Sequence, residues 1–335
     1  MPRWGVEVKH LPDLVTTLPR PINMYKIVTL EEVDSQIDDS KLLAFDTETD
    51  GFYGAIELAQ FYQAEWPEPL LVSKPNPLEL ASSLQHKPFI AHLAHYDIST
   101  IQQQTGTAWI PDSFDCTFYL SRLYYYKHQK FSLDEVLQYV LGYDPYEQLG
   151  LDKKALQKSA WSSVLGEEQL QYAALDVFHL LDVYEATKTM RDDFNYQLDI
   201  FFTRNCLDFQ WNGMPVIEKE LQMRYEQNLF EIAAMNMPIN VNSYKQVREY
   251  IGSEDSDALG LTKLKLLGNT RAADVLKTRK IIKQNSFLKK FDADEGRIYG
   301  KFLPSARSGR CTSKDQNLQQ LPRSTKSVFG VEEDS

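Results

Sequence analysis

The pattern of apolar and polar positions divides the chain into a first part with strands and a second part dominated by helices. Four short apolar or alternating stretches predict strands at residues 41–45, 56–60, 70–72 and 89–91. Thr29 and Glu32 have the spacing of a capping box and predict a short helix that runs toward Ile37. The remaining pattern between residues 77 and 190 is helical. This order predicts an α/β domain of about 190 residues.

The strand pattern fades after residue 205. Between residues 218 and 236 one helix face is marked by Leu221, Tyr225, Leu229 and Ile232, and this spacing predicts a long helix in a second, mainly helical unit. A chain of 335 residues is also too long for one ordinary core. The last thirty or so residues are polar with little periodicity, so composition alone predicts a loop or a frayed tail there.

Composition indicates a globular protein, with 43% hydrophobic and 25% charged residues. Cys116, Cys206 and Cys311 lie far apart without CxxC spacing, which argues against a zinc site or a disulfide framework and fits a reducing compartment. The opening residues lack an apolar signal core, and no run of 18 apolar residues occurs. We therefore expect a cytoplasmic location and no membrane association.

A net charge of −11 argues at first against a nucleic-acid partner, because phosphate binding needs Lys and Arg. The charge is unevenly spread, however: residues 261–310 carry 13 Lys or Arg against 4 Asp or Glu. A chain with one basic stretch can bind phosphates locally and use its carboxylates for metal ions. The alternative is that this stretch is only a solvated charged face.

Two carboxylates follow the first predicted strand. Asp46 and Glu48 stand in the sequence FDTET, and the two-residue period of a strand points both side chains to the same side. Two aligned carboxylates favour a cation between them. A solvated strand end is the alternative that this pair alone leaves open.

Three further candidates lie on predicted helices. Asp97 occurs where a helix begins, so capping is a sufficient structural explanation for it. Tyr172 and Asp176 are four residues apart in a helical stretch and therefore share one face. We expect an apolar stripe on another face to pack against the sheet, formed by Leu170, Ala174, Val177, Leu181 and Tyr184. His179 is interpreted as an ordinary, partly buried histidine.

The joint occurrence of these residues favours one site, because a strand end, a helix start and a helix face can converge at the carboxyl edge of one sheet. Four carboxylates that close together repel one another unless cations separate them. Hard oxygen ligands favour Mg²⁺ or Mn²⁺, and two such ions about 4 Å apart can cut a phosphodiester. One ion would generate the attacking hydroxide and the other would stabilise the leaving 3' oxygen, while Tyr172 would hold the water or a phosphate oxygen.

At this point the sequence resembles a known family. DTET, HYD and YAALD look like the three motifs of the DEDD exonuclease superfamily in its tyrosine branch, over roughly residues 25–190. The resemblance implies a ribonuclease H-like fold, cleavage of nucleotides from 3' ends, and Asp46, Glu48, Asp97 and Asp176 as ligands of two divalent ions. Members often have Asn four residues before the third carboxylate, where this chain has Leu93.

The tyrosine branch includes both ribonuclease D and the proofreading domains of family A DNA polymerases. The later sequence favours the polymerases, because LDFQWNGMPVIEKELQ and INVNSYKQV resemble their thumb and SGRCTSKDQNLQQLPR resembles the entry to their palm. The implied domains are an exonuclease at 1–195, a helical thumb-like region at 196–300 and the start of a palm at 301–335. The supposed tail then becomes a nucleic-acid-facing segment, with Arg307, Arg310, Asn317 and Gln319 as candidate contacts.

The later polymerase motifs of the palm and fingers do not occur in this sequence. The resemblance therefore implies the front half of a split or shortened polymerase, of the kind phages carry, which would act on single-stranded 3' ends and primer-template DNA. A second polypeptide would carry the missing palm and fingers. Two alternatives stay open: a ribonuclease D-like enzyme that digests RNA, and a subunit without catalytic activity that assembles a split polymerase.

Overall fold

The computed structural model describes residues 25–51, 54–291, 293, 295–303, 306, 309–314 and 316–330. Arg307, one of the predicted nucleic-acid contacts, lies outside the described residues. The chain divides into two compact units, Met1–Leu207 and Asp208–Ser335. This boundary falls within helix α10 (Phe194–Asn212). The three-domain division predicted from the sequence stays a prediction.

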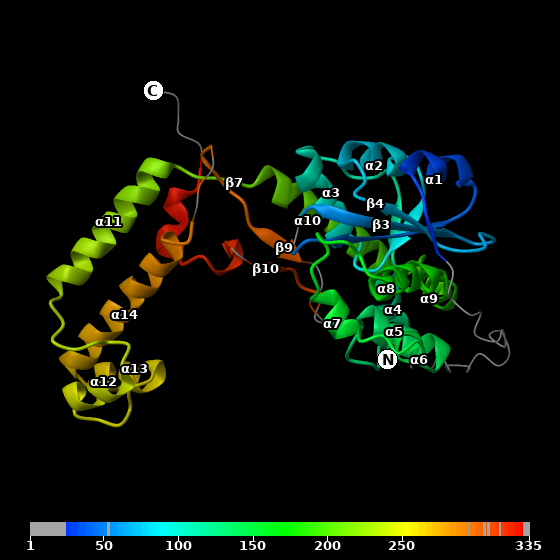
Figure 1. The fold of residues 1–335 in the computed structure, drawn as a ribbon. Coiled ribbons are helices and arrows are strands. Elements are labelled where there is room, and N and C mark those ends of the chain that lie inside the picture. Colours follow the sequence, from blue (N-terminus) through cyan, green and yellow to red (C-terminus); the bar gives the residue numbers. More distant parts are fainter. Residues whose placement is uncertain are drawn as a thin grey trace. The chain divides into compact units, whose positions relative to one another are not determined.

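The first unit is built on a six-stranded sheet in the order β1-β4-β3-β2-β5-β6. Figure 1 labels two of its strands, β3 and β4. The strands are β1 (Lys26–Ile27), β2 (Leu43–Thr49), β3 (Ile56–Gln63), β4 (Leu70–Ser73), β5 (Phe89–Ala91) and β6 (Phe114–Cys116). β3 runs antiparallel to both β2 and β4, whereas β1 with β4, β2 with β5 and β5 with β6 are parallel pairs. The predicted mixed α/β architecture is therefore confirmed.

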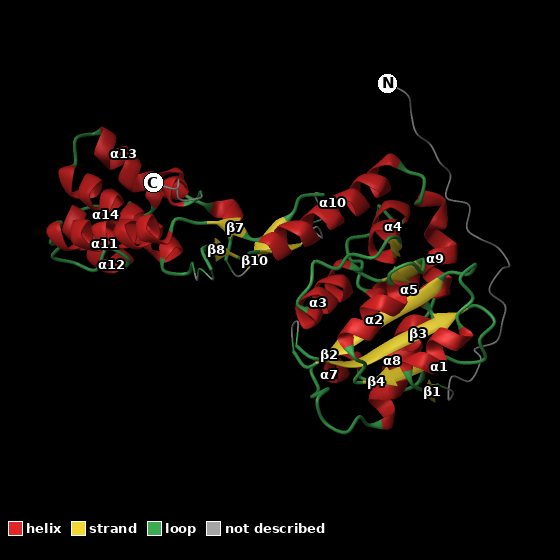
Figure 2. Ribbon diagram, turned by 90° about the horizontal axis from the view of Figure 1, so that it is seen from above, coloured by secondary structure: helices red, strands yellow, loops and turns green. Residues whose placement is uncertain are grey.

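Helices enclose this sheet, as Figure 2 shows with strands in yellow and helices in red. They are α1 (Leu30–Gln36), α2 (Pro77–Leu84), α3 (His95–Thr105), α4 (Thr117–Tyr124), α5 (Leu133–Leu141), α6 (Pro145–Gln148), α7 (Lys153–Gln157), α8 (Glu167–Phe178) and α9 (Leu180–Thr187), followed by the 3₁₀ turn Lys188–Met190. The capping box predicted for α1 is confirmed, because the Glu32 N–H donates to Thr29 Oγ1 and the Thr29 N–H donates to Glu32 Oε2.

The centre of the first unit is an aromatic cluster that fixes strand β2 between its two neighbours. The Phe45 ring lies 5.4 Å from Phe61 on β3 and 5.5 Å from Phe89 on β5. All three rings are fully buried. On the other face of the sheet, α8 packs on β2, β3 and β4. Strand β2 is thus held on both sides, so side chains near its end are presented from a rigid base.

The second unit is mainly helical, with α11 (Glu218–Ala234), α12 (Tyr244–Ile251), α13 (Ala258–Leu266) and α14 (Thr270–Leu288). The long helix predicted at 218–236 is confirmed. Two side-chain hydrogen bonds link α14 to α11 and its C-terminal cap Met235: Asn228 Nδ2 donates to Asn285 Oδ1 at 3.4 Å, and Thr278 Oγ1 donates to Met235 Sδ at 3.0 Å. Two short antiparallel strand pairs also belong to this unit, β7 (Met214–Pro215) with β8 (Arg297–Ile298) and β9 (Lys301–Leu303) with β10 (Thr312–Lys314).

The loop or frayed tail predicted from composition is wrong for the described part of the C-terminal segment. β10 pairs with β9, and two 3₁₀ helices follow at Leu318–Gln320 and Arg323–Val328. Leu318 and Val328 are buried in one cluster with residues of the second unit such as Phe291. Two apolar anchors are enough to order a polar segment. Among the described residues, no helix has the length and apolar character needed to cross a membrane.

Candidate active site

Strand β2 carries Asp46 and Glu48 inside the sheet rather than beyond its end. The strand continues to Thr49 because it pairs with β3 along its length, with Asp46 opposite Gln60 and Glu48 opposite Leu58. The prediction that the strand ends at residue 45 is therefore wrong, but the prediction of a shared side is confirmed. Successive side chains alternate between the two faces, so both carboxylates lie on the face covered by α8.

Helix α8 brings the third carboxylate to this face. Asp46, Glu48 and Asp176 each offer a carboxylate oxygen, and these atoms all lie within 4.8 Å of one another. Asp176 belongs to the buried part of α8 together with Tyr172. The structure thus brings together residues from sequence positions 46, 48 and 176, as the sequence predicted.

Asp97 lies beside this group, at the start of α3. Its side chain is 1% exposed, and its Oδ1 accepts a hydrogen bond of 2.7 Å from Thr47 Oγ1. Thr47 separates Asp46 from Glu48 on β2, so this bond ties α3 to the strand of the cluster. Asp97 is not part of the set whose oxygens lie within 4.8 Å of one another. Its negative charge nevertheless helps to raise the pKa of both Asp46 and Glu48.

Tyr172 is buried next to Asp176, with its hydroxyl oxygen accepting a 3.3 Å hydrogen bond from Gln157 Nε2. The Tyr146 ring lies 5.6 Å from the Tyr172 ring, and the Tyr146 hydroxyl donates to Asp176 Oδ1. Two tyrosines therefore flank one carboxylate. Gln157 occupies one acceptor position of the Tyr172 oxygen, and the Tyr172 hydroxyl itself donates to Asp176.

Electrostatics in the cluster favour a bound cation. Burial raises the pKa of Asp46 well above its usual value, and the charges of Asp97, Asp176 and Glu48 raise it further. Burial likewise raises the pKa of Glu48, with added repulsion from Asp176 and Asp97, while Lys153 opposes the shift. A positive ion at this position would remove the repulsion and let all the carboxylates ionise.

The other two carboxylates show the same tendency. Burial raises the pKa of Asp97 to about 7, against the hydrogen bond from Thr47. Burial also raises the pKa of Asp176, an effect opposed by the charge of Lys153 and by hydrogen bonds from Tyr146 and Tyr172. Buried carboxylate oxygens are the donors that Mg²⁺ and Mn²⁺ prefer, so the residues present fit such an ion.

Sequence reasoning missed three neighbours of the cluster: Thr47, Tyr146 and Lys153. Lys153 Nζ lies 4.8 Å from the centre of the Tyr146 ring and 3.1 Å from Asp134 Oδ1. The Lys153 ammonium group is therefore near the carboxylates, but its ion pair is with Asp134. Tyr146 belongs to the four-residue helix α6, which has no periodic signal. Only Thr47 could have been found from the sequence. It lies between two carboxylates that share one face of the strand, so the two-residue period predicts that its hydroxyl lies on the other face, where it meets Asp97.

The described nucleic-acid candidates belong to the second unit. Arg310 and Gln319 are exposed. Asn317 caps the 3₁₀ helix Leu318–Gln320, because its Oδ1 accepts from the N–H groups of Gln319 and Gln320 at 3.2 Å each. Asn317 therefore has a local structural role, which leaves its side-chain amide nitrogen free of that capping bond.

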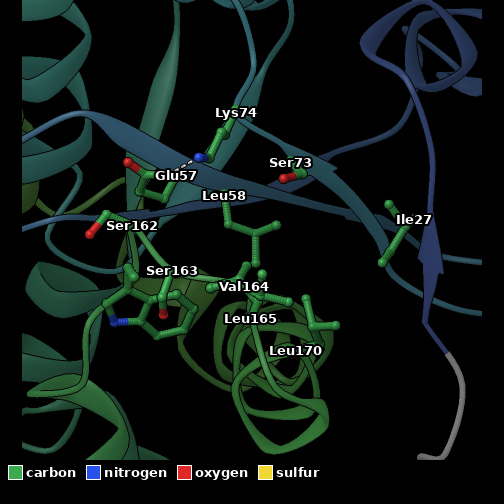
Figure 3. A pocket seen from close by; sticks show the side chains of 11 residues that line it. Ile27, Glu57, Leu58, Ser73, Lys74, Ser162, Ser163, Val164, Leu165 and Leu170 are labelled. Atoms are coloured by element: carbon green, nitrogen blue, oxygen red, sulfur yellow. Dashed lines mark ion pairs between the residues drawn. The ribbon is translucent and has the colours of Figure 1, made fainter.

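The first unit also contains a hollow of about 370 Å³ (Figure 3). Leu58, Trp161 and Leu165 contribute apolar walls, and Lys74 Nζ lies 3.4 Å from Glu57 Oε2 at its edge. Leu58 is the cross-strand partner of Glu48, and the Trp161 ring lies 6.2 Å from the Tyr172 ring. The hollow is therefore lined by neighbours of the site residues, and none of the four carboxylates lines it.

Comparison with known proteins identifies the family. Residues 21–191, about half of the chain, match the model of a 3'-5' exonuclease family found in family A DNA polymerases. DNA polymerase I of Aquifex aeolicus (strain VF5) is 24% identical over 355 residues, covering 91% of this chain and 58% of that protein. The chain therefore spans a little over half the length of this relative.

A solved structure agrees in fold. The POL domain of Pol1 from M. smegmatis, in complex with DNA primer-template and dNTP, matches with a TM-score of 0.67 at 16% identity. The match covers 91% of this chain and 57% of that one. The mixed sheet with its flanking helices is thus the ribonuclease H-like fold that the sequence predicted, followed by a helical region. The chain belongs to the 3'-5' exonuclease domain family of family A DNA polymerases.

Proposed function

We propose that this protein is a proofreading exonuclease that hydrolyses 3'-terminal nucleotides from DNA with the help of two Mg²⁺ or Mn²⁺ ions. Family membership makes the domain a nuclease and implies a divalent metal ion. The observation that carries the finer proposal is the group of Asp46, Glu48 and Asp176, with oxygens within 4.8 Å of one another and Asp97 beside them. These four carboxylates are the proposed ligands.

Each residue of the site has a distinct part in this mechanism. When bound, the ions would supply an activated water and neutralise the charge that develops on the leaving 3' oxygen. Asp46 and Glu48 hold their positions because this part of β2 pairs with β3, while the start of the strand is also paired with β5. Tyr146 engages Asp176 Oδ1, which leaves the other oxygen of that carboxylate for an ion. Tyr172 donates to Asp176 in the metal-free protein and would turn its hydroxyl to the attacking water or a phosphate oxygen once an ion holds that carboxylate.

The second unit is the proposed grip on DNA. The basic stretch at residues 261–310 would bind duplex phosphates, and Arg307, Arg310, Asn317 and Gln319 would contact primer or template. Binding should therefore weaken steeply between about 50 and 200 mM salt. The division into 1–195, 196–300 and 301–335 belongs to this proposal.

The test is digestion of a 5'-labelled single-stranded DNA in Mg²⁺. The protein should produce a descending ladder, and Asp46→Ala should abolish it because one of the converging carboxylates is lost. Asp39→Ala is the matched control, since Asp39 is an exposed acid of the same unit and should leave the ladder unchanged. An unchanged ladder from the Asp46→Ala protein would remove the assignment.

The same assay decides the substrate. Matched DNA and RNA oligonucleotides of one sequence should be cut at different rates, with DNA faster. A clear preference for RNA would replace the proposal with the ribonuclease D-like alternative. Absence of any cleavage, together with copurification of a polymerase fragment that needs this chain, would point to the assembly subunit instead.

A further inference from the structure

Gln60, in the middle of strand β3, is a buried amide without a hydrogen-bond partner. Its side chain is 0% exposed, and neither Nε2 nor Oε1 has a partner among the described residues. A buried polar group that is left unpaired lowers stability, and such groups in a well-packed interior call for an explanation. Burial of a glutamine on this strand does not by itself leave it unpaired, as Gln63 shows.

Gln63 is 1% exposed, yet its amide is fully engaged. Its Nε2 donates to the carbonyls of Asp38 and Lys41 at 2.9 and 3.1 Å, and its Oε1 accepts from the Asp38 N–H at 2.9 Å. The two buried glutamines, three residues apart on the same strand, therefore differ in the groups that their side chains face. Gln63 faces backbone groups, whereas Gln60 faces the carboxylate cluster.

The register of the sheet places Gln60 against Asp46. The two residues are directly opposite each other on β3 and β2, so their side chains leave the sheet on the same face, with Cβ atoms about 4.5–5.5 Å apart. Gln60 shares that face with Leu58 and Tyr62, and the Tyr62 ring lies 5.0 Å from Phe178 of α8. The amide is thus enclosed between α8 and the strand that carries Asp46.

We propose that Gln60 is a positioning residue for the metal site, whose Nε2 donates to the Asp46 carboxylate when a divalent ion is bound. This inference rests on the proposed function. A carboxamide suits the task because it is neutral, so it holds a carboxylate without competing with the cation, as a lysine would. Its Oε1 is then available to accept from water in the site. Asp46 would be held at one oxygen by Gln60 and would offer the other to the ion.

Gln60 has opposite effects in the metal-free and the metal-bound protein. In the metal-free protein the amide is buried and unpaired, which lowers stability. In the loaded protein the same amide orients a ligand, and loss of such an outer partner commonly weakens metal binding by about 10–100-fold. Removing the amide should therefore raise the stability of the metal-free protein and lower its affinity for metal. A purely structural role predicts a loss of stability and no change in affinity.

The test uses the full chain stripped of metal, with Mn²⁺ binding measured by calorimetry and thermal unfolding measured without metal. Gln60→Met keeps the length of the side chain and removes both polar atoms, and Gln60→Leu is the second variant. Both should melt above the unsubstituted protein and bind Mn²⁺ about 10-fold more weakly. Gln63→Met is the matched control: it should melt lower, because three hydrogen bonds are lost, and bind Mn²⁺ unchanged.

The outcomes separate this inference from the function on which it rests. If the unsubstituted protein binds Mn²⁺, Asp46→Ala binds it poorly and both Gln60 variants bind it normally, only the role of Gln60 is overturned. Gln60 variants that melt lower and keep their affinity, as Gln63→Met should, overturn it equally. If the unsubstituted protein fails to bind Mn²⁺, the metal site and the role of Gln60 fall together.

Discussion

Different factors limit the stability of the two units: repulsion among buried carboxylates in the first, and little apolar burial in the second. The first unit has large buried clusters, yet it encloses four carboxylates whose charges oppose one another. Within its described residues, the second unit has two small clusters of six buried residues each, which include Val328 and Val247. It leaves large apolar side chains in solvent, among them Phe230 at 75% and Leu267 at 84% exposure.

The contrast shows where each unit can gain stability. The first unit has ample apolar burial and an excess of negative charge, so a cation should stabilise it strongly. The second unit lacks a large core and depends on individual polar contacts. Arg279 is an example, because it donates to the carbonyls of Val241 and Ser256 at 2.6 and 2.9 Å and lies 5.6 Å from the Tyr244 ring.

The largest expected effect is a pH dependence confined to the metal-free first unit. Burial raises the pKa of Asp97 from 3.8 to about 7, so the folded protein keeps a proton that the unfolded chain has already released. Stability should therefore fall as the pH rises from about 4 to about 7, by up to ~4 kcal/mol. Hydrogen exchange followed by mass spectrometry across this pH range, in the presence of a chelator, reads the two units separately.

Excess Mg²⁺ should remove this loss, because it favours the ionised carboxylates. Asp97→Asn in the chelator should make the pH profile of the first unit shallower without flattening it, because the pKa values of Asp46, Glu48 and Asp176 are raised as well, while peptides of the second unit keep their profile. If the first unit gained stability with rising pH in the absence of metal, this would contradict the claim that repulsion among its buried carboxylates limits its stability.

A smaller effect is expected from Arg279→Ala in the second unit. Two buried carbonyls lose a charged donor, so the free energy of unfolding should fall by about 2–3 kcal/mol in that unit. Arg279→Lys should not restore it, because an ammonium cannot reproduce two directed bonds and the ring contact. Hydrogen exchange in the first unit should stay unchanged. Equal loss of protection in both units would mean that they unfold as one, and would contradict the expectation that Arg279 stabilises the second unit alone.

The smallest effect concerns the backbone just before α3. Leu93 has a φ of 64°, in the left-handed region that costs a leucine about 1–2 kcal/mol. Leu93→Asn should therefore stabilise the first unit by about 1 kcal/mol, since asparagine tolerates this conformation. Chemical denaturation would measure it. Leu93→Val is the opposing control and should destabilise, and a Val variant as stable as the Asn variant would show that backbone strain is not the cause.

Much of the first unit could be predicted from its sequence because its signals are local. The capping box needs only Thr29 and Glu32, and the shared side of Asp46 and Glu48 follows from the period of a strand. The long helix α11 followed from apolar spacing in the same way. The roles assigned to the carboxylates and to Tyr172 stay predictions, although the structure brings the residues together.

The features that escaped prediction depend on contacts distant in sequence. β1 and β6 have two and three residues, too few for any periodicity, and they exist because neighbouring strands pair with them. Tyr146 reaches Asp176 across 30 residues from a helix of a single turn. The expected face of α11 also missed its most buried residue, Asn228, because its polar side chain is satisfied by Asn285 on another helix.

The two contacts between α11 and α14 fix how these helices are aligned. Asn228 meets Asn285 and Met235 meets Thr278, so the contacts are spaced seven residues apart on each helix. Sliding one helix past the other by a turn would separate both pairs at once and bury the amides against carbon. A leucine pair would pack well in several alignments, whereas this pair accepts one. The polar contacts between α11 and α14 thus stabilise the pair less than apolar packing would, but they favour a single alignment. The Lys- and Arg-rich helix α14 is therefore held in one position along α11.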